Sequence, residues 1–580
     1  MRAWLALACK GLRLGLGLGL AGGASAAGPA IKVNQLGFLP QGAKLTVVGL
    51  KDAANGGAPF EVLDARSGKA VFKGVLSAAA VWQPSGEAVA IADFSTLQAP
   101  GEYRIKVGGA ALSDAFPIRQ SAYRKLNAAA LKAFYFNRAG IALPASLAGQ
   151  WARPAGHADT RVLVHASTAS GARPQGTLFA SPKGWYDAGD YNKYIVNSGI
   201  ATYTLLAALE HFPDFFAGQQ VGLPESGNGL PDVLNEALWN LEWMLTMQDP
   251  ADGGVYHKLS NLGFDAMVMP HQAMTAPRYA AAKSTAAALD FAATMAVASR
   301  VVKAYPRQLP GLSARMLAAA ERAWQWAQAN PALVFKNAAD IKTGEYGDAT
   351  LADEQAWAAA ELFISSGKDA YARALRPESV ANSVPAWSEV RGLAWMSLAH
   401  HRDRLGPQAD RQLIARRIDE LSAQLAASWR ASPYRLAMQP RDFVWGSNAV
   451  VLNQAMMLIQ GYRLNGQEDY LRAAQSGLDY VLGRNPLGLS YVTGFGARSP
   501  LFPHHRPSQA DGVAAPVPGF VVGGPQAGQQ DKGDCPPYPS ALPALSYIDH
   551  VCSYASNEVA INWNAPLVYV SAALEALTPR

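Results

Sequence analysis

The sequence predicts a molecule of two parts, an all-β sandwich near the N-terminus and an all-α domain that follows it. Two observations support this. Residues 30–118 contain short stretches of alternating polar and apolar residues, separated by Gly, Pro, Asn and Asp, which is typical of a sandwich. From Tyr123 onward, apolar residues recur at helical spacing. A chain of 580 residues, 50% of them hydrophobic, is long enough to bury two cores.

The first 26 residues have the layout of a secretory signal peptide. Basic residues precede a short apolar stretch over 14–21, and small residues end at Ala24-Ser25-Ala26, which resembles an A-x-A cleavage site. A membrane anchor is the alternative, but the apolar stretch is short and rich in glycine. We therefore expect a secreted or periplasmic protein.

The remaining charge is small. Removing residues 1–26 takes away three positive charges and no negative ones, so the formal net charge falls from +6 to +3. This surplus, with no Lys/Arg cluster among aromatics, argues against nucleic acid or an anionic membrane as a partner. No other run approaches the roughly 20 apolar residues that cross a bilayer. A monomer is expected.

Cys535 and Cys552 are the cysteines that remain after Cys9 leaves with the signal peptide. An even pair in an exported chain is consistent with a disulfide, and two separate thiols are the alternative. The two cysteines alone cannot form a four-ligand zinc site.

The elements follow in order along the chain. Strands are expected at 44–50, 88–94 and 101–107. About eleven helical segments, close to six hairpins, come next: one from Tyr123, then 194–212, 232–248, 283–305, 313–329, 352–366, 389–402, 409–429, 447–464, 468–483 and 557–576. Many are rich in Ala and apolar on more than one face, as in helices buried between neighbours.

Three long Gly/Pro-rich loops connect these helices, over 151–193, 249–282 and 484–556. Hairpins place their loops at the two ends of a bundle, where functional residues commonly lie. We therefore expect the functional site in these loops.

The stretch GWYDAGDYNKY, residues 184–194, ends the first loop and places Asp187 and Asp190 among aromatic rings. Two neighbouring carboxylates repel each other unless a cation, a water or a substrate lies between them. A simple turn is the alternative, since Asp and Gly are turn residues.

Two further clusters lie at the end of the chain. Residues 490–508 contain His504, His505 and Arg506 after a proline, and a surface turn would be the plainer interpretation. Residues 547–566 contain Asp549, Tyr554 and Glu558, which we place at the start of the final helix. A helix-start carboxylate favoured by the dipole is the alternative interpretation of Glu558.

Together the loops offer the groups that cleave a glycosidic bond. One carboxylic acid protonates the leaving oxygen, and a second carboxylate activates water or attacks the sugar. Aromatic faces stack on sugar rings, and Arg, His and Asp bond hydroxyls. No glycine-rich phosphate loop, GxSxG or HExxH motif competes with this interpretation.

The motifs resemble those of one known family. GWYDAGDYNKY resembles the aspartate motif of glycoside hydrolase family 9, a cellulase family with an (α/α)6 barrel. Residues 490–506 are similar to its histidine signature, and residues 547–565 to its second signature. VNQLGF, residues 33–38, resembles the opening of the Ig-like module that precedes the barrel in one branch. The resemblance implies an Ig-like sandwich over 30–118 and an (α/α)6 barrel over 123–580.

The resemblance also implies roles for individual residues. Asp190 matches the general base, Asp187 the partner that helps hold the attacking water, and Glu558 the general acid. Four further residues match positions that bind or support the substrate: His504, Arg506, Asp549 and Tyr554. The family inverts the anomeric centre, so base and acid flank a water as well as the sugar.

The expected activity is endo-hydrolysis of a β-1,4-glucan, such as soluble cellulose derivatives or mixed-linkage glucan. Exo-action as a cello-oligosaccharide or glucosaminide hydrolase is the alternative among enzymes. A non-catalytic, secreted glucan-binding protein is the alternative from another class, but it would have lost an acid or a base, and all three carboxylates are present.

Two metals are considered. Some members of the family hold zinc in the loop before the aspartate motif, but residues 153–167 offer only His157 and His165 and no cysteine, so no zinc is expected. Residues 344–357 resemble the acidic helix start that binds structural calcium, with Asp353 and Glu354 as the matching ligands. A helix N-terminus capped by these residues is the alternative.

Overall fold

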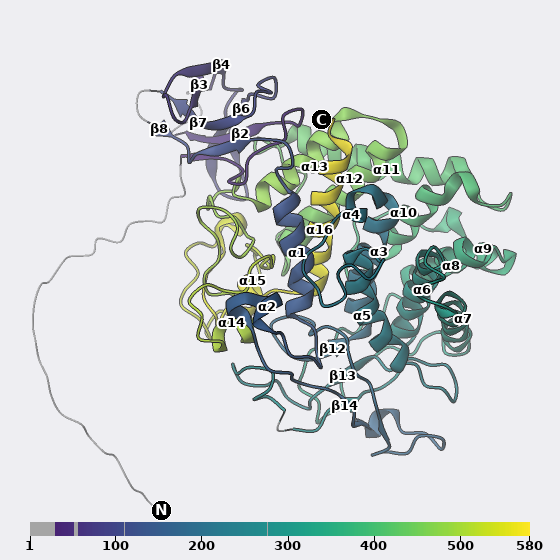
Figure 1. The fold of residues 1–580 in the computed structure, drawn as a ribbon. Coiled ribbons are helices and arrows are strands. Elements are labelled where there is room, and N and C mark those ends of the chain that lie inside the picture. Colours follow the sequence, from purple (N-terminus) through teal and green to yellow (C-terminus); the bar gives the residue numbers. More distant parts are fainter. Residues whose placement is uncertain (1–29, 51–55, 109–110, 275, 580) are drawn as a thin grey trace, which may run out of the picture.

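The structure is a computed structural model that describes residues 30–50, 56–108, 111–274 and 276–579 (Figure 1). An N-terminal β-sandwich is followed by a helical domain, which confirms the predicted order of the two parts. The predicted signal peptide, residues 1–26, lies outside the described residues.

The sandwich consists of two antiparallel sheets. One has the order β1 (Ile31–Lys32), β2 (Leu45–Leu50), β6 (Glu87–Asp93) and β5 (Ala80–Trp82). The other has the order β4 (Ala70–Val75), β3 (Pro59–Asp64), β7 (Gly101–Val107) and β8 (Ala111–Leu112), and β9 (Phe116–Ile118) also pairs with β7. Phe38, Phe94 and Phe116 meet in its core, with ring centroids 5.5 Å apart.

The helical domain contains eleven helices of ten or more residues within the described part of the chain. They are α1 (Arg124–Phe136), α3 (Ile195–His211), α5 (Asp232–Thr246), α6 (Thr285–Val302), α7 (Leu312–Ala329), α8 (Ala352–Ser366), α10 (Arg391–His401), α11 (Arg411–Ala431), α12 (Ser447–Asn465), α13 (Glu468–Val481) and α16 (Ile561–Leu577). Each lies within four residues of a segment expected from helical spacing.

The helices pack in two layers. Helices α3, α6, α12 and α16 are buried on nearly all sides, whereas α7 and α11 bury one face and expose the other. This difference follows from composition, because each of the four buried helices carries only one or two charged residues, whereas α7 carries three and α11 six. Among the described helices, α6 alone has the length and mean hydropathy, 18 residues and 1.3, of a membrane span, and 94% of it is buried in the protein.

Two of the predicted loops form a sheet that the sequence did not indicate. Its order is β11 (Leu178–Phe179), β10 (Val162–Val164), β14 (Tyr279–Ala280), β13 (Lys258–Ser260) and β12 (Lys193–Tyr194). Strands this short show no usable periodicity. The sheet matters for the site, because β12 directly follows the two aspartates of the 184–194 motif and pairs with β13.

The sandwich packs against the helical domain, beside α12 and α13 in Figure 1. Asn34 Nδ2 donates to Asp479 Oδ1 of α13 over 2.8 Å. Trp82 lies with its ring centroid 4.3 Å from that of Tyr434 and 6.0 Å from that of Phe443. The two domains therefore share buried polar and aromatic contacts.

Candidate active site

Asp187 and Asp190 are both buried, just before β12, but their surroundings differ. Asp187 accepts hydrogen bonds on both oxygens, from Asn197 Nδ2 and from the Tyr346 hydroxyl, each over 2.8 Å. Asp190 Oδ2 accepts from Asn192 Nδ2 over 2.5 Å, whereas its buried Oδ1 has no partner. Asp190 thus has a free acceptor in the site.

Glu558 lies beside this pair, but not at the start of the final helix. It is an extended residue between the short α15 (Tyr554–Asn557) and α16, because residues 558 and 559 form bridges with His504 and Val522. The Gly189 N–H lies 3.4 Å from Glu558 Oε1 and donates to it. The structure therefore brings together the first and last predicted motifs, 369 residues apart in the sequence.

Gly189, between the two aspartates, is required by this close approach. A Cβ at this position would lie 2.2 Å from the His504 carbonyl oxygen, well inside van der Waals contact. The glycine lets the backbone of the aspartate motif lie directly against the 503–506 segment.

Burial raises the pKa of all three carboxyl groups. Burial, and then the Asp190 charge, raises the pKa of Asp187 to about 8. Burial also raises the pKa of Asp190, but the Arg506 charge and the Asn192 hydrogen bond oppose it. Burial and both aspartates raise the pKa of Glu558 well above its usual value. Glu558 is therefore suited to carry a proton at neutral pH.

His504 and Arg506 flank the carboxylates in different ways. His504 Nδ1 lies 2.6 Å from the Val551 carbonyl oxygen, so this nitrogen carries the hydrogen, and burial lowers the pKa of the ring to about 4. Arg506 donates to the carbonyl oxygens of Asp265 and Gly189. The Arg506 guanidinium therefore fixes the backbone of the aspartate motif, beyond the sugar contact expected from sequence.

Asp549 also binds the protein itself. Its oxygens accept from the backbone N–H groups of Leu501 and Phe502 over 2.8 and 2.9 Å, and from Asn557 Nδ2 over 3.0 Å. It therefore shapes the loop that leads to His504.

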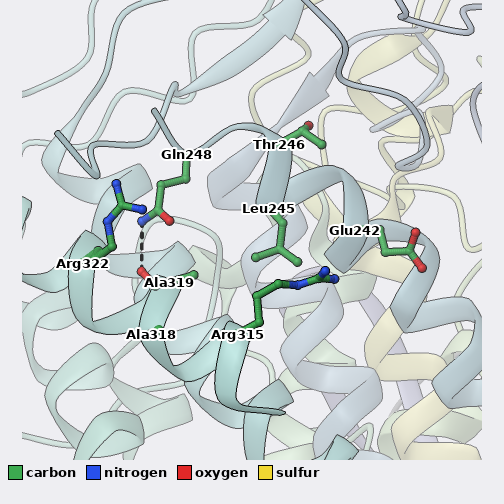
Figure 2. A pocket seen from close by; sticks show the side chains of 8 residues that line it. All are labelled: Glu242, Leu245, Thr246, Gln248, Arg315, Ala318, Ala319 and Arg322. Carbon is green, nitrogen blue, oxygen red and sulfur yellow. Dashed lines mark hydrogen bonds between the residues drawn. The ribbon is translucent and has the colours of Figure 1, made fainter. Parts of the chain in front are cut away.

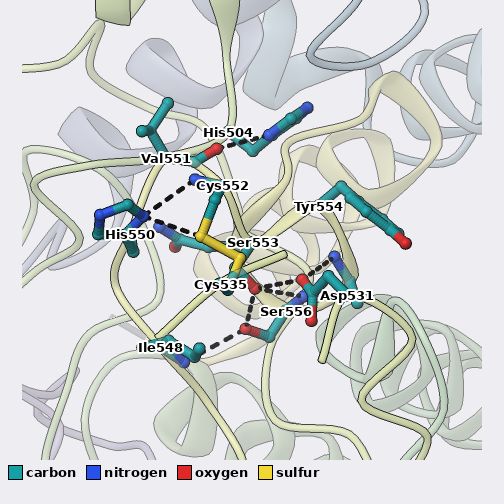
Figure 3. Close-up of a disulfide and its surroundings, with 12 residues drawn as sticks. His504, Asp531, Cys535, Ile548, His550, Val551, Cys552, Ser553, Tyr554 and Ser556 are labelled. Atoms are coloured by element: carbon teal, nitrogen blue, oxygen red, sulfur yellow. Dashed lines mark hydrogen bonds between the residues drawn. A yellow bond between two sulfur atoms is a disulfide. The ribbon is translucent and has the colours of Figure 1, made fainter. Parts of the chain in front are cut away.

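Tyr554 and a disulfide lie near His504 (Figure 3). The Tyr554 ring centroid is 5.4 Å from that of Trp445, which is 42% exposed, and 6.3 Å from that of His504. Cys535 and Cys552 are joined, with an S–S distance of 2.05 Å, so of the two interpretations left open by the sequence the structure has the disulfide. Cys552 directly follows Val551, whose carbonyl oxygen binds His504.

Residues considered for metals fall in two groups. His157 Nδ1 lies 2.9 Å from the Tyr186 hydroxyl, whereas His165 Nε2 pairs with Asp340 over 3.1 Å, so the two rings serve separate contacts. In the part of the chain that the structure describes, no group of three or more His, Cys, Asp or Glu residues is arranged as a formed metal site.

Asp353 and Glu354, at the start of α8, nevertheless lie near two further acids, the buried Asp290 of α6 and the half-buried Asp348. Each carboxylate of the group has at least one buried oxygen without a hydrogen-bond partner: Asp290, Asp348, Asp353 and Glu354. Burial and mutual repulsion raise the pKa values of Asp290 and Glu354. Neither Asp353 nor Glu354 is the N-cap of α8, which is Leu351. Carboxylates with free oxygens fit a hard cation.

A separate pocket of about 510 Å³ lies between α5 and α7 (Figure 2). Its lining residues are Glu242, Leu245, Thr246, Gln248, Arg315, Ala318, Ala319 and Arg322. No carboxylate of the predicted site and no aromatic ring is among them, so this pocket is not where the sugar chemistry is expected.

Sequence comparison decides the family. Residues 123–571 match the family described as "Glycosyl hydrolase family 9", and residues 26–111 match "Cellulase N-terminal ig-like domain". The chain belongs to glycosyl hydrolase family 9. It is therefore a glycoside hydrolase, and its helical domain is the (α/α)6 barrel of the family, preceded by an Ig-like domain.

Three relatives show the range of this family. A xyloglucan-specific endo-β-1,4-glucanase of Bacteroides ovatus is 42% identical, over 94% of each chain. A cellulose 1,4-β-cellobiosidase of Acetivibrio thermocellus is 33% identical, over 95% of this chain and 67% of the other. The structure of a thermostable endoglucanase from Alicyclobacillus acidocaldarius is 35% identical, with a TM-score of 0.84, over 94% of this chain and 99% of the other.

Four residues of the site were not found from sequence: Asn192, Tyr194, Asn197 and Tyr346. The first three lie in or just after the aspartate motif, so their place was a usable signal. Tyr346 lies 159 residues after Asp187, and nothing in its local sequence indicates that contact.

Proposed function

We propose that this family 9 hydrolase is an exported, monomeric, inverting endo-β-1,4-glucanase. The observation that supports the mechanism is the unlike bonding of the two aspartates: Asp190 keeps a free buried oxygen, whereas both oxygens of Asp187 accept hydrogen bonds from the protein. Asp190 is then the general base. Asp187 orients the water through its remaining lone pairs.

The reaction follows from these roles. Water attacks the anomeric carbon and passes a proton to Asp190, while the bond from that carbon to the glycosidic oxygen breaks. Glu558, held protonated by burial and by the neighbouring charges, gives its proton to the leaving oxygen. His504 keeps Nε2 free to accept a hydrogen bond from a sugar hydroxyl.

The substrate proposed is a β-1,4-linked glucan chain, either a soluble cellulose derivative, mixed-linkage glucan or xyloglucan. The Bacteroides ovatus relative supports xyloglucan by its name, and the exposed Trp445 ring and the half-buried Tyr554 ring offer stacking surfaces for sugar. The cellobiosidase relative supports exo-action as the second candidate. A fall in viscosity of carboxymethyl-cellulose that outpaces release of reducing ends indicates endo-action, and release of monomer alone contradicts it.

Product analysis by NMR on a defined cello-oligosaccharide tests the mechanism directly. Inversion predicts that the newly formed reducing end appears first as the α-anomer and later mutarotates. A β-anomer formed first contradicts the base role of Asp190, because it requires a covalent intermediate.

The acid role has its own test. Glu558→Gln should lower turnover on unactivated glucan by about 10²–10⁴-fold, the usual contribution of general acid catalysis. The loss should be smaller on an aryl cellobioside with a good leaving group, since that bond needs less protonation. Equal losses on both substrates contradict the role.

We also propose that Asp353 and Glu354, with Asp290 and Asp348, hold a structural Ca²⁺. Four carboxylates with unpartnered buried oxygens repel one another, and a divalent cation relieves that repulsion. Melting of chelator-treated protein should shift upward when Ca²⁺ is added, because a ligand that binds only the folded state stabilises it. An unchanged melting temperature, or the same shift in the Asp290→Asn variant, contradicts the site.

Export rests on the N-terminal pattern and on the disulfide, since such bonds persist outside the reducing cytoplasm. Fractionation of cells producing the full chain, with N-terminal sequencing of the mature form, tests both export and the expected cleavage after Ala26.

A further inference from the structure

Lys258, on β13, is a buried cation whose three acceptors are all uncharged. Its side chain is fully buried. Nζ donates to Asn337 Oδ1 over 2.8 Å, to Thr343 Oγ1 over 2.9 Å and to the Gly344 carbonyl over 2.7 Å. Burying an ammonium that makes no direct ion pair is costly, so this lysine calls for an explanation beyond packing.

Lys258 is linked to Asp190 through the Tyr194 side chain. It pairs with Tyr194 across β12 and β13, and its Nζ is 5.5 Å from the centroid of the Tyr194 ring. The Tyr194 hydroxyl in turn lies 3.5 Å from Asp190 Oδ2. The attraction of Asp190 opposes the lowering of the Lys258 pKa by burial, so the ammonium and the proposed base stabilise each other.

The segment that Lys258 holds leads to Asp187. Tyr346 has φ +50°, a left-handed conformation that a non-glycine residue adopts at a cost. Two side chains hold the carbonyl groups of the two residues before Tyr346. Lys258 Nζ donates to the Gly344 carbonyl oxygen, and His257 Nε2 lies 3.0 Å from the Glu345 carbonyl oxygen. In this conformation the Tyr346 hydroxyl reaches Asp187 Oδ2.

We propose that Lys258 is a positioning residue of the catalytic centre, which fixes the 343–346 segment so that Tyr346 holds Asp187 in place to orient the water. This inference rests on the proposed function, because it assigns Asp187 that role. Without the ammonium, the segment relaxes toward ordinary backbone angles, and Asp187 loses one of its two hydrogen bonds.

A double-mutant cycle tests the route. Lys258→Met keeps most of the length of the side chain and removes its donors, and Tyr346→Phe removes the hydroxyl. Each single variant should lower kcat on a defined cello-oligosaccharide by about 10- to 100-fold, the cost of a small misplacement at a reacting centre, with KM nearly unchanged. In the Tyr346→Phe background, Lys258→Met should cause little further loss, because both changes break one chain of contacts.

Two further variants keep the test decisive. Thr343→Val removes one acceptor of the Lys258 ammonium and keeps its charge, so it should cause a smaller loss of kcat. That loss should also disappear in the Tyr346→Phe background. This variant tests the same route if Lys258→Met fails to fold. Lys32→Met removes a buried lysine from the Ig-like domain, where it pairs with Glu87, and should leave kcat unchanged.

If the fold losses of kcat in the two single variants multiply in the double variant, the proposed role of Lys258 is wrong. A change in KM alone, with kcat unchanged, also contradicts it. Failure of the proposed function looks different: the wild-type protein itself would then leave β-1,4-glucans intact.

Discussion

Asp187 and Asp190 lie three residues apart, and their hydrogen bonds suit them to different tasks. Asn197 and Tyr346 bind both oxygens of Asp187, which fixes its orientation. Asp190 keeps one oxygen free, and the Arg506 charge favours its ionised form. An ionised carboxylate with a free lone pair is what a general base requires.

Azide separates the two roles. Asp190→Ala should be nearly inactive, and azide should partly restore turnover, because this anion replaces the water without needing a base. The product should be the inverted α-glycosyl azide. Asp187→Ala should also lose activity but gain less from azide, since Asp190 remains. Rescue of the Asp187 variant alone would mean that the two roles are exchanged.

The raised pKa of Asp187 also predicts how stability depends on pH. Because its pKa of about 8 in the folded protein exceeds the usual 3.8, the folded state binds the proton more tightly than the unfolded state. The contribution is therefore present at low pH and is lost as the pH rises toward 8. Asp187→Asn should melt above the wild type at pH 8, with a gap that closes toward pH 4. A gap that is constant between these pH values would contradict the shift.

Sequence motifs identified the acidic residues of the site better than the residues that hold them. Asp187, Asp190 and Glu558 stand in recognisable local patterns. Tyr346 and Lys258 act through contacts between distant segments, and neither has a local signature. Arg506 matched a signature too, but the partners of its guanidinium, two backbone carbonyl groups, follow from the folded path of the chain.

At the scale of elements, long helices were predictable and short strands were not. Helical spacing placed α8 at 352–366, where the structure has it. The final helix was expected from 557 but begins at Ile561, because residues 558 and 559 pair with other segments instead. This difference frees Glu558 from the helix and turns it toward the aspartates.

The disulfide stabilises the loop that lies beside His504. It closes a loop between cysteines 17 residues apart, which is worth about 3 kcal/mol of stability. Replacing both Cys535 and Cys552 by Ser should lower the free energy of unfolding by up to about this amount. It should also raise KM, because Val551, which holds His504, directly precedes Cys552. His550→Ala, which removes an exposed neighbour and keeps the bond, should leave KM unchanged; a stability loss without a KM change contradicts the positioning role.

At the scale of the whole molecule, the VNQLGF stretch is one of the places where the two domains meet. Asn34 binds Asp479, 445 residues away, and Gln35 Nε2 donates to the Gly488 carbonyl over 2.8 Å. A Cβ on Gly37 would lie 2.0 Å from the Pro117 carbonyl oxygen, so the glycine is required there. The motif was visible in the sequence, but its docking role depends on partners that only the fold supplies.

The Ig-like domain also supports an aromatic wall of the proposed sugar site. Trp82 is buried against Tyr434 and Phe443, and Phe443 lies two residues before the exposed Trp445. The Ig-like domain therefore packs against the segment that carries Trp445, whose ring contacts Tyr554.

Trp82→Ala should therefore affect both stability and substrate binding. Truncating a buried Trp costs about 3–5 kcal/mol of stability. The cavity that the truncation leaves lies against Tyr434 and Phe443. The segment that carries Trp445 is then less well held, so KM for long glucans should rise. Phe60→Ala is the matched control, because Phe60 is buried inside the sandwich and its ring packs on Phe72. Both variants are assayed below their melting temperatures, where the Phe60 variant should keep the wild-type KM. If the Trp82 and Phe60 variants have the same KM, the Ig-like domain contributes to stability only, and the position of Trp445 does not depend on it.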